Sequence, residues 1–410
     1  MLAEAPRLRA RDRILDAATL RLSRHGIRGT TLRAIAHDAG TTLASLESLF
    51  GSKDDLVIAC FDAAVNRDAT RLADLSATCV QMRLDRDYLA DLLWTLCETG
   101  PGPDSIDQLL CLELWLQTPQ NPAYAPACRR WIVGRRDGIR AIGRIFGLCD
   151  NVADILALHL ISESLFAVSC SAAPAWRVAA RAGFVEAVVR LTGWPQAGHA
   201  GSTADLATSF YADRNEQPVR APHASRRGRT LIVNAAAAII EESGLGAVTN
   251  RAVAARAGVS LSSTTYHFRS VGDLAFHGVL RLFEIARASA PAIRRLENTM
   301  ENARGWIATR ASPTAIERVG TRGMAEISLA AARGQLPLAL GVGIRRQRGT
   351  VTDGVLKASG FTNISRSCVA SHSLWFAGVF LTTAAVSDAE TLFDFEAQAE
   401  TTARALLGFA

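Results

Sequence analysis

The chain has 410 residues, 49% of them hydrophobic and 20% charged, which is long enough for two or three domains with large cores. The net charge of +6 is compatible with nucleic-acid binding but indicates little alone, because many soluble proteins are this basic. The eight cysteines form no CxxC pair, and no Cys/His cluster has zinc spacing. We therefore expect reduced thiols in a cytoplasmic protein, with no metal site and no cofactor.

Two segments bear on targeting and membranes. The first 13 residues contain no apolar run of signal-peptide length. Residues 368–386 lack formal charge and approach the length of a membrane span, but they also hold His372 and several hydroxyl side chains. We expect a buried bundle helix there and no membrane partner.

Residues 1–66 read as an arm followed by a small helical domain. Ile14, Ala18 and Leu22 form the apolar stripe of a first helix, which Gly26 ends. A second helix is expected at 31–39 and a third at 43–50. Residues 1–10 read as a flexible arm, and arginines alternate in and after it, where they suit either DNA phosphates or a solvated positive start: Arg7, Arg9, Arg11 and Arg13.

Residues 67–195 are expected to form a first helical body. Aromatic and cysteine side chains of its middle helices could line an apolar ligand pocket, and ordinary core packing is the alternative. Its last two expected helices, 151–170 and 176–192, have apolar faces broad enough for a helix–helix interface as well as a core. The pocket candidates are Trp94, Cys97, Trp115 and Trp131.

Residues 196–228 read as a linker rich in glycine, proline and charge, with a short helix expected at 205–213. Its end carries a basic cluster, Arg226, Arg227 and Arg229, at the same place as the first arm. A phosphate contact and a solvated linker are both open interpretations of this cluster.

Residues 229–288 are expected to form a second small helical domain. Thr249 can cap a short helix, and Gly258 follows where a tight turn needs positive φ. Ser260 can open the next helix, which Phe268 closes, and residues 270–273 read as a capping box. Two short helices joined by a glycine turn indicate a helix-turn-helix, whose second helix fits the major groove of DNA.

The two small domains are copies of one pattern. Gly40 and Gly258 lie 218 positions apart, and that offset aligns the flanking residues without a gap. A chance helix pair would not stay in register so long, so we infer an internal duplication. Aligned pairs include Arg11 with Arg229, Gly26 with Gly244, Thr31 with Thr249, Arg33 with Arg251, Phe50 with Phe268 and Asp55 with Asp273.

These residues carry a family resemblance. Both ILDAATLRLSRHGIRGTTLRAIAHDAG and LIVNAAAAIIEESGLGAVTNRAVAARAG resemble the N-terminal three-helix domain of TetR-family transcriptional regulators, and GVSLSSTTYHFRSVGDL resembles their recognition helix. The resemblance implies an all-α fold of two TetR-like protomers fused in one chain. It also implies a second ligand-binding, dimerisation-like body at 289–410, and final helices of both bodies that build a four-helix dimer interface.

Candidate DNA contacts follow from the helix starts and exposed polar groups. The first recognition helix departs from the family pattern because it offers Ala44, Ser45, Glu47 and Ser48. Weak binding, a different half-site and lost binding are the alternatives for that head. The candidates are Thr249, Arg251, Ser260, Ser262, Ser263, Thr265, Tyr266 and His267 in the second head, and Thr31, Arg33, Thr41, Thr42, Ser45, Ser48 and Lys53 in the first.

The resemblance implies a sequence-specific DNA-binding transcriptional regulator, usually a repressor, released by a small apolar effector. Fusion implies a single-chain pseudo-dimer on double-stranded DNA with unlike half-sites, and a further homodimer stays open. The alternative is a binding module in which only the second head reads DNA, or a scaffold that binds none. No GxSxG, HExxH or phosphate-cradling loop occurs, so we do not expect an enzyme.

Overall fold

The computed structural model describes residues 4–98, 103–170, 173–196, 227–268, 270–293, 315–361 and 363–409. Throughout these ranges the chain is helical, without a strand, which confirms the all-α prediction. Most of the expected linker, with its short helix at 205–213 and Arg226, lies outside them.

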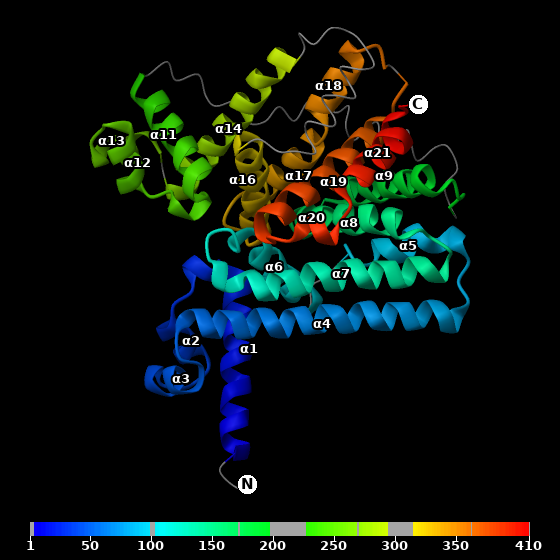
Figure 1. Cartoon of the computed structure of the whole chain (residues 1–410). Helices are drawn as coiled ribbons and strands as arrows, with labels where there is room; N and C mark the ends of the chain where they lie inside the picture. The colour runs from blue at the N-terminus through cyan, green and yellow to red at the C-terminus, as the bar shows by residue number, and fades with distance from the viewer. Residues whose placement is uncertain are drawn as a thin grey trace.

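The first half contains two groups of helices (Figure 1). A head is formed by α1 (Glu4–Gly29), α2 (Leu32–Asp38) and α3 (Leu43–Phe50). The long helix α4 (Lys53–Met82) leads into the body. The body continues with η1 (Arg86–Tyr88), α5 (Leu89–Trp94), α6 (Pro103–Gln117), η2 (Pro122–Tyr124), α7 (Ala125–Ile145), α8 (Asp150–Cys170) and α9 (Pro174–Thr192).

The second half repeats this order. Its head is formed by α11 (Arg227–Ser243), η3 (Leu245–Ala247), α12 (Asn250–Ala257) and α13 (Leu261–His267). Its body contains α14 (Val271–Ile293), α16 (Ala315–Ala332), α17 (Leu338–Gln347), α18 (Thr350–Ala358), α19 (Arg366–Ala385), α20 (Ala389–Leu392) and α21 (Phe395–Leu407).

The first helix is longer than the sequence suggested. A flexible arm was expected at residues 1–10, but α1 already begins at Glu4. The expectation was wrong because the stretch consists mostly of strong helix formers, and Pro6 lies in the first turn, where no backbone hydrogen bond is lost. The side chains of Arg7 and Arg9 lie outside the described residues.

The same capping bonds form in both heads. Thr31 Oγ1 accepts from Ala34 N at 3.2 Å, and Thr249 Oγ1 accepts from Ala252 N at 3.1 Å. The glycine turns also match, because Gly40 and Gly258 have φ of +61° and +65°. Ser270 accepts from the amide three residues on, as expected for the start of a helix. The duplication is therefore present in local backbone structure as well as in sequence.

One long helix of the first body, α7, corresponds to two short helices in the second body. α17 begins at Leu338 and α18 ends at Ala358, each 213 positions after the corresponding end of α7. The break between α17 and α18 contains Gly349, whose φ is +78°. A Cβ at this position would lie 2.8 Å from the Val369 carbonyl oxygen. The second body therefore replaces one straight helix by two short ones at a site that requires glycine.

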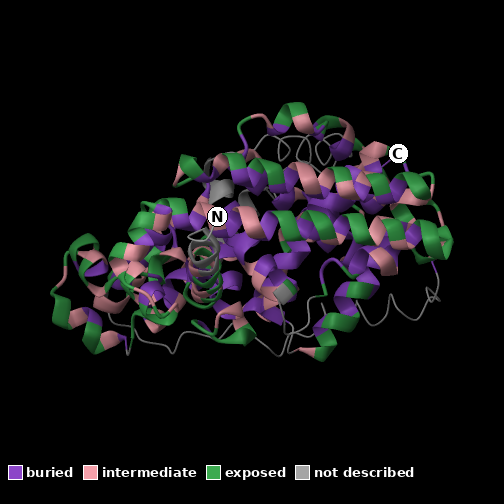
Figure 2. Cartoon of the chain, turned by 90° about the horizontal axis from the view of Figure 1, so that it is seen from below, coloured by how far each residue is buried: buried purple, intermediate pink, exposed green. Residues whose placement is uncertain are grey.

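The halves join through the last helices of each body. α8 crosses α19 so closely that a Cβ on Gly378 would lie 2.6 Å from the Leu158 carbonyl oxygen. α9 contacts α19 and α21 as well, so the four helices form one bundle. At its rim, Asn151 Nδ2 donates to Thr401 Oγ1 at 2.8 Å. Buried residues of both halves make a continuous core along the middle of the body (Figure 2).

Two helices are long and apolar enough to cross a membrane, but both belong to this bundle. In α8, 94% of the apolar window is buried inside the protein, and in α19 the share is 78%. The prediction of a buried bundle helix at 368–386 is confirmed.

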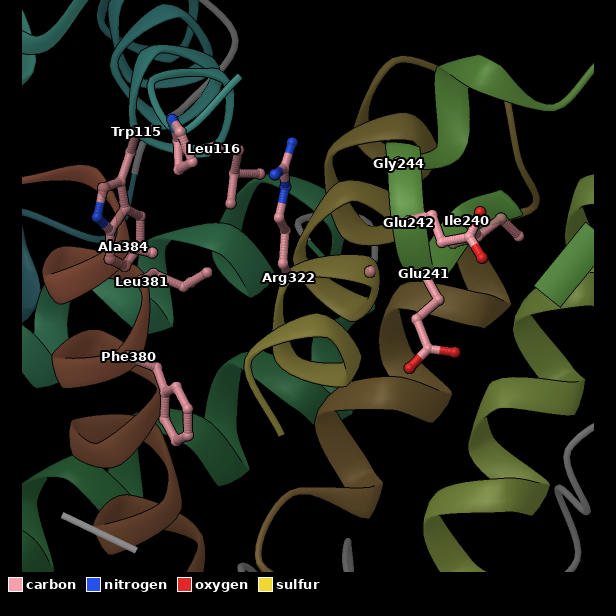
Figure 3. A pocket seen from close by; sticks show the side chains of 12 residues that line it. Trp115, Leu116, Ile240, Glu241, Glu242, Gly244, Arg322, Phe380, Leu381 and Ala384 are labelled. Carbon is pink, nitrogen blue, oxygen red and sulfur yellow. The ribbon is translucent and has the colours of Figure 1, made fainter. Parts of the chain in front are cut away.

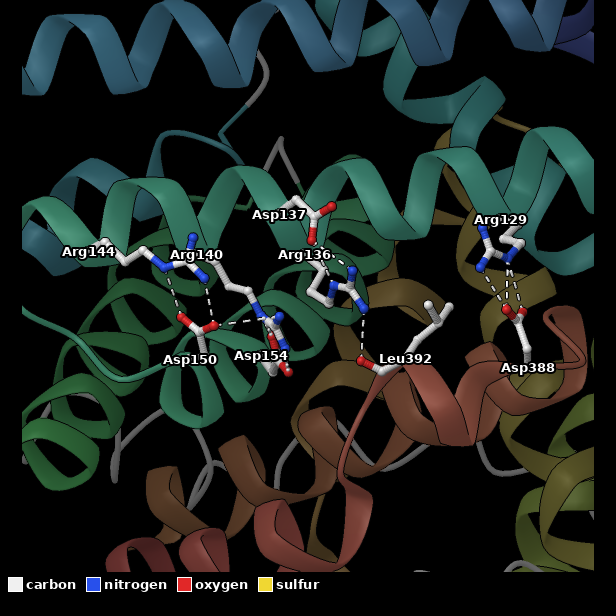
Figure 4. A network of polar contacts seen from close by, with 9 residues as sticks. All are labelled: Arg129, Arg136, Asp137, Arg140, Arg144, Asp150, Asp154, Asp388 and Leu392. Carbon is white, nitrogen blue, oxygen red and sulfur yellow. Dashed lines mark hydrogen bonds and ion pairs between the residues drawn. The ribbon is translucent and has the colours of Figure 1, made fainter.

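Polar contacts at the edge of α7 also run between the two halves (Figure 4). Arg129 Nη2 pairs with Asp388 at 2.7 Å, and Arg136 Nη1 donates to the Leu392 carbonyl oxygen at 2.8 Å. Both partners belong to the second half. Because Arg129 and Asp388 are largely exposed, their ion pair adds little stability and mainly fixes how the halves align.

Candidate nucleic-acid interface

Both heads project from the same side of the body, with α2 and α3 below α12 and α13 in Figure 1. Each second helix, α2 or α12, is followed by a tight glycine turn and a third helix. This is the helix-turn-helix geometry, in which the third helix enters the major groove.

One face of α13 is exposed and polar. Ser262, Thr265 and Tyr266 are exposed, and Tyr266 keeps 74% of its surface accessible. Spacings of three and four residues place them on one helical face. Thr264 and Phe268 are buried on the opposite face, against the head's core. The exposed face therefore combines hydroxyl groups with an aromatic ring, groups that can contact base edges and phosphates.

Other candidates of the second head lie at its edges. Ser260 Oγ caps α13 by accepting from Ser263 N at 3.2 Å, and it also lies 2.9 Å from Ser262 Oγ. Ser263 and His267 are half-buried, and the His267 ring packs edge-on against Tyr266. Arg251 is exposed in the first turn of α12, after the cap Thr249.

The first head places its candidate residues at similar positions, but the exposed face of its third helix carries fewer groups that can contact DNA. Ser48 is exposed, and it stands where the second head has Tyr266. Glu47 is exposed beside it. Thr42 Oγ1 caps α3 by accepting from Ser45 N at 3.1 Å. The remaining candidates are Thr31, which caps α2, the exposed Arg33, and the half-buried Thr41 and Ser45.

Lys53 has a structural partner. Its Nζ donates to the Ile27 carbonyl oxygen at 2.7 Å, at the end of α1. The ammonium therefore ties the start of α4 to the first helix of its own head. A phosphate would have to compete with this bond for the same donor.

The sequence interpretation missed a contact that both heads share. The Arg11 guanidinium lies 4.9 Å from the centre of the Phe50 ring, and that of Arg229 lies 5.0 Å from the centre of the Phe268 ring. Such cation–π contacts hold the residue that closes the recognition helix. Both pairs are aligned by the 218-residue offset. That alignment is the signal in the sequence that could have indicated the shared contact. A phosphate contact by Arg11 or Arg229 stays a prediction.

Comparison with protein families identifies these heads. A family model described as bacterial regulatory proteins of the tetR family matches residues 14–60 and again residues 232–276. The chain carries two TetR-family DNA-binding domains in tandem. The two matches begin 218 positions apart, the offset that aligns the glycine turns. No curated protein matches the chain.

The two TetR-family domains mark the chain as a DNA-binding transcriptional regulator, and regulators of this family are generally not enzymes. Among the residues that the structure describes, no group of three or more His, Cys, Asp or Glu side chains could hold a metal ion.

The TetR-family heads differ in charge. Residues 31–55 contain two basic and four acidic residues, whereas residues 249–273 contain three basic and one acidic residue. A hydrogen bond from His37 and the charge of Arg21 lower the pKa of Asp38, and hydrogen bonds from Ser52 lower that of Asp55. These carboxylates of the first head therefore stay ionised and repel phosphates.

All four pocket candidates are buried, and the rings of Trp115 and Trp131 pack edge-on with centres 6.1 Å apart. Trp94, Cys97 and Trp131 are buried in the first body's core, where Trp131 Nε1 donates to Asp68 at 3.0 Å. Burial raises the pKa of Cys97 to about 12, so it stays a thiol. Trp115 alone of the four lines a described cavity, which lies beside the second head. Ligand contact by these residues stays a prediction.

Proposed function

We propose that the chain is a sequence-specific transcriptional repressor that binds one operator as a single-chain pseudo-dimer. The helices that join its halves, α8 and α9 with α19 and α21, are the last ones of each body, as in a dimer of separate TetR-family chains. Paired helix-turn-helix domains place their recognition helices about 34 Å apart, so that both enter the major groove on one face of the duplex. Fusion makes this pairing intramolecular and independent of dilution.

Crossed hydrogen bonds between the halves carry this proposal. Gln120 Nε2 of the first body donates to the Ser243 carbonyl oxygen at the end of α11, at 3.2 Å. Gln335 Nε2 of the second body donates to the His25 carbonyl oxygen of α1 at 3.5 Å. His25 and Ser243 keep the 218-residue offset. Each body thus holds the other half's head in an equivalent way, which supports a two-fold arrangement of heads.

The unlike recognition helices favour an asymmetric operator. A symmetric dimer presents identical side chains and reads a palindrome. Here one helix offers Ser48 and Glu47 where the other offers Tyr266 and Thr265. The proposed operator therefore has two different half-sites.

Release of DNA is proposed to follow binding of a small apolar effector in a body. An effector shifts the equilibrium only if it binds the non-binding conformation more tightly. Because the bodies contact both heads through the crossed bonds, a shift in either body reaches both recognition helices.

In a second candidate function, only one of the two heads reads DNA. The acidic balance of the first head and its exposed Glu47 favour it. In this version the first head completes the scaffold, and the second head alone supplies base contacts and specificity.

Paired substitutions separate the two versions. Replacing both Arg251 and Tyr266 with alanine removes two exposed groups of the second head, and we expect a loss of about 2–4 kcal/mol in binding to a selected operator. If both heads read DNA, Arg33→Ala with Ser48→Ala should also cost about 1–2 kcal/mol. The measurement is a titration of the labelled operator at fixed salt. An unchanged affinity of the second variant favours the single-reader version, and unchanged affinity of both contradicts DNA reading by these helices.

A further inference from the structure

A cavity of about 200 Å³ lies where the second head meets both bodies (Figure 3). Its walls come from α6 of the first body, from the end of α11, and from α16 and α19 of the second body. Its Trp115 packs edge-on against Trp131 of the first body's core, with the ring centres 6.1 Å apart. Glu242, which is exposed, lines it, so it reaches the surface on the α11 side.

The cavity combines an aromatic wall with one cationic group, and on the α11 side it is also lined by Glu241 and by Glu242, which is paired with Arg256. Trp115 and Phe380 are buried, and Leu381 lies beside them (Figure 3). Arg322 rises from α16 between α6 and the end of α11 (Figure 3). Its Nη2 atom is buried without a hydrogen-bond partner. A buried unsatisfied guanidinium nitrogen is costly, and an anionic oxygen would satisfy it.

Arg322 is also connected to the second head. Its Nε donates to Glu326 Oε1 at 3.0 Å, and Glu326 Oε2 accepts from Leu245 N at 2.7 Å. Leu245 follows Gly244, the residue that ends the first helix of that head and itself lines the cavity. A ligand oxygen at Arg322 Nη2 would compete with Glu326 for the charge of the same guanidinium. The carboxylate that holds the head's turn would then be paired less strongly.

The first half differs at the positions that open this cavity. Glu113 makes the equivalent bond, accepting from Ile27 N at 2.8 Å. However, Arg322 and Gly323 are replaced there by Leu109 and Leu110, 213 positions earlier. Gly323 leaves the wall open, because a Cβ there would meet nothing closer than 3.7 Å. The arginine and the glycine that shape this cavity are therefore found in the second half and not at the equivalent positions of the first.

From this geometry we propose that the cavity binds a small aromatic carboxylate, with the ring against Trp115 and Phe380 and the carboxylate on Arg322. Apolar cavities of about 150 Å³ hold a benzene ring, so one ring with a short acidic group fits. Binding loosens the turn at Leu245 and weakens DNA binding by the second head. The regulatory part of this inference rests on the proposed function, whereas ligand binding does not.

The test measures binding of the probe 4-fluorobenzoate to the full-length protein by fluorine NMR. We expect saturable binding that Arg322→Leu weakens about tenfold or more, the effect of losing a charge-assisted hydrogen bond. Uncharged 4-fluorotoluene should bind this variant as well as it binds the unaltered protein. Gly323→Leu, which restores the first half's residue, should fill the cavity and abolish binding of both probes. The matched control Arg181→Leu removes an exposed arginine of α9 paired with Asp91 and should change nothing.

Circular dichroism and operator binding without ligand check that each variant folds. Absence of saturable binding, or binding unaffected by both Arg322→Leu and Gly323→Leu, overturns the proposed site. With operator present, the probe should lower DNA affinity about five- to hundredfold, the usual range of allosteric coupling. Binding that leaves DNA affinity unchanged overturns the regulatory link. Failure to bind any DNA contradicts the proposed function instead, because probe binding is measured without DNA.

Discussion

Arg11 and Arg229 each place a guanidinium over the aromatic ring that closes the third helix of their head. Arg229 also donates to His277 Nε2 at 2.9 Å, and burial together with Arg229 lowers the pKa of His277, so its ring nitrogen is available to accept. Residues that build the heads are thus kept in both copies. Residues that face outward, such as Ser48 and Tyr266, have diverged. This division is expected when two heads share a fold but read different sequences.

A buried histidine at the joint makes stability depend on pH. Burial and repulsion from Arg345 of the second half lower the pKa of His159 to about 3, from an ordinary value of 6.5. The unfolded chain binds this proton at higher pH than the folded chain does. The contribution to stability is therefore complete above pH 6.5 and falls as the pH drops toward 3, by about 1.4 kcal/mol per pH unit.

Chemical unfolding at pH 7 and at pH 4.5 measures this dependence. His159→Gln cannot be protonated in this range, so its loss of stability between the two pH values should be smaller by about 2–3 kcal/mol. An equal loss in both proteins would mean that His159 is not held neutral by the fold.

At the scale of helices, local signals predicted the heads well. The expected third helix at 43–50 matches α3, because Thr42 caps it through its own side chain and Gly51 follows it. The start of α13 at Leu261 likewise follows from the cap Ser260. Such boundaries depend on bonds within four residues, which a sequence displays directly.

Contacts between distant segments were not predictable in this way. The break in the second body, the bond from Lys53 to Ile27 and the cavity at Arg322 each need the position of another helix. The offset of 218 residues aligned the heads but said nothing about which body touches which head. The boundaries of the helices in the heads were therefore predictable, and the contacts between the heads and the bodies were not.

Neighbouring serines of α13 should have separable effects. Ser260→Ala removes the helix cap and should lower the free energy of unfolding by about 1 kcal/mol. Ser262→Ala leaves the cap in place and should change stability by less than about 0.5 kcal/mol, while weakening operator binding. Thermal unfolding and DNA titration of the two variants test this separation. Equal destabilisation by both would contradict the assigned cap.

At the scale of the whole molecule, the fused halves form one unit. The joint contains a buried ion pair between Glu163 of α8 and Arg345 of α17, at 2.9 Å. A second pair links Glu113 of α6 to Arg333 of the other half at 2.6 Å. Removing one partner of such a pair leaves a buried charge, so these contacts fix one alignment of the halves. The heads are consequently held at a set spacing by contacts within one chain.

Selection of DNA sites from a random pool by the purified protein, followed by footprinting, tests the central claim most directly. We expect two different half-sites, centred about 10 base pairs apart or a multiple of that spacing, with both protected by one chain. A palindrome, or a single protected half-site, would contradict the single-chain pseudo-dimer with two unlike readers.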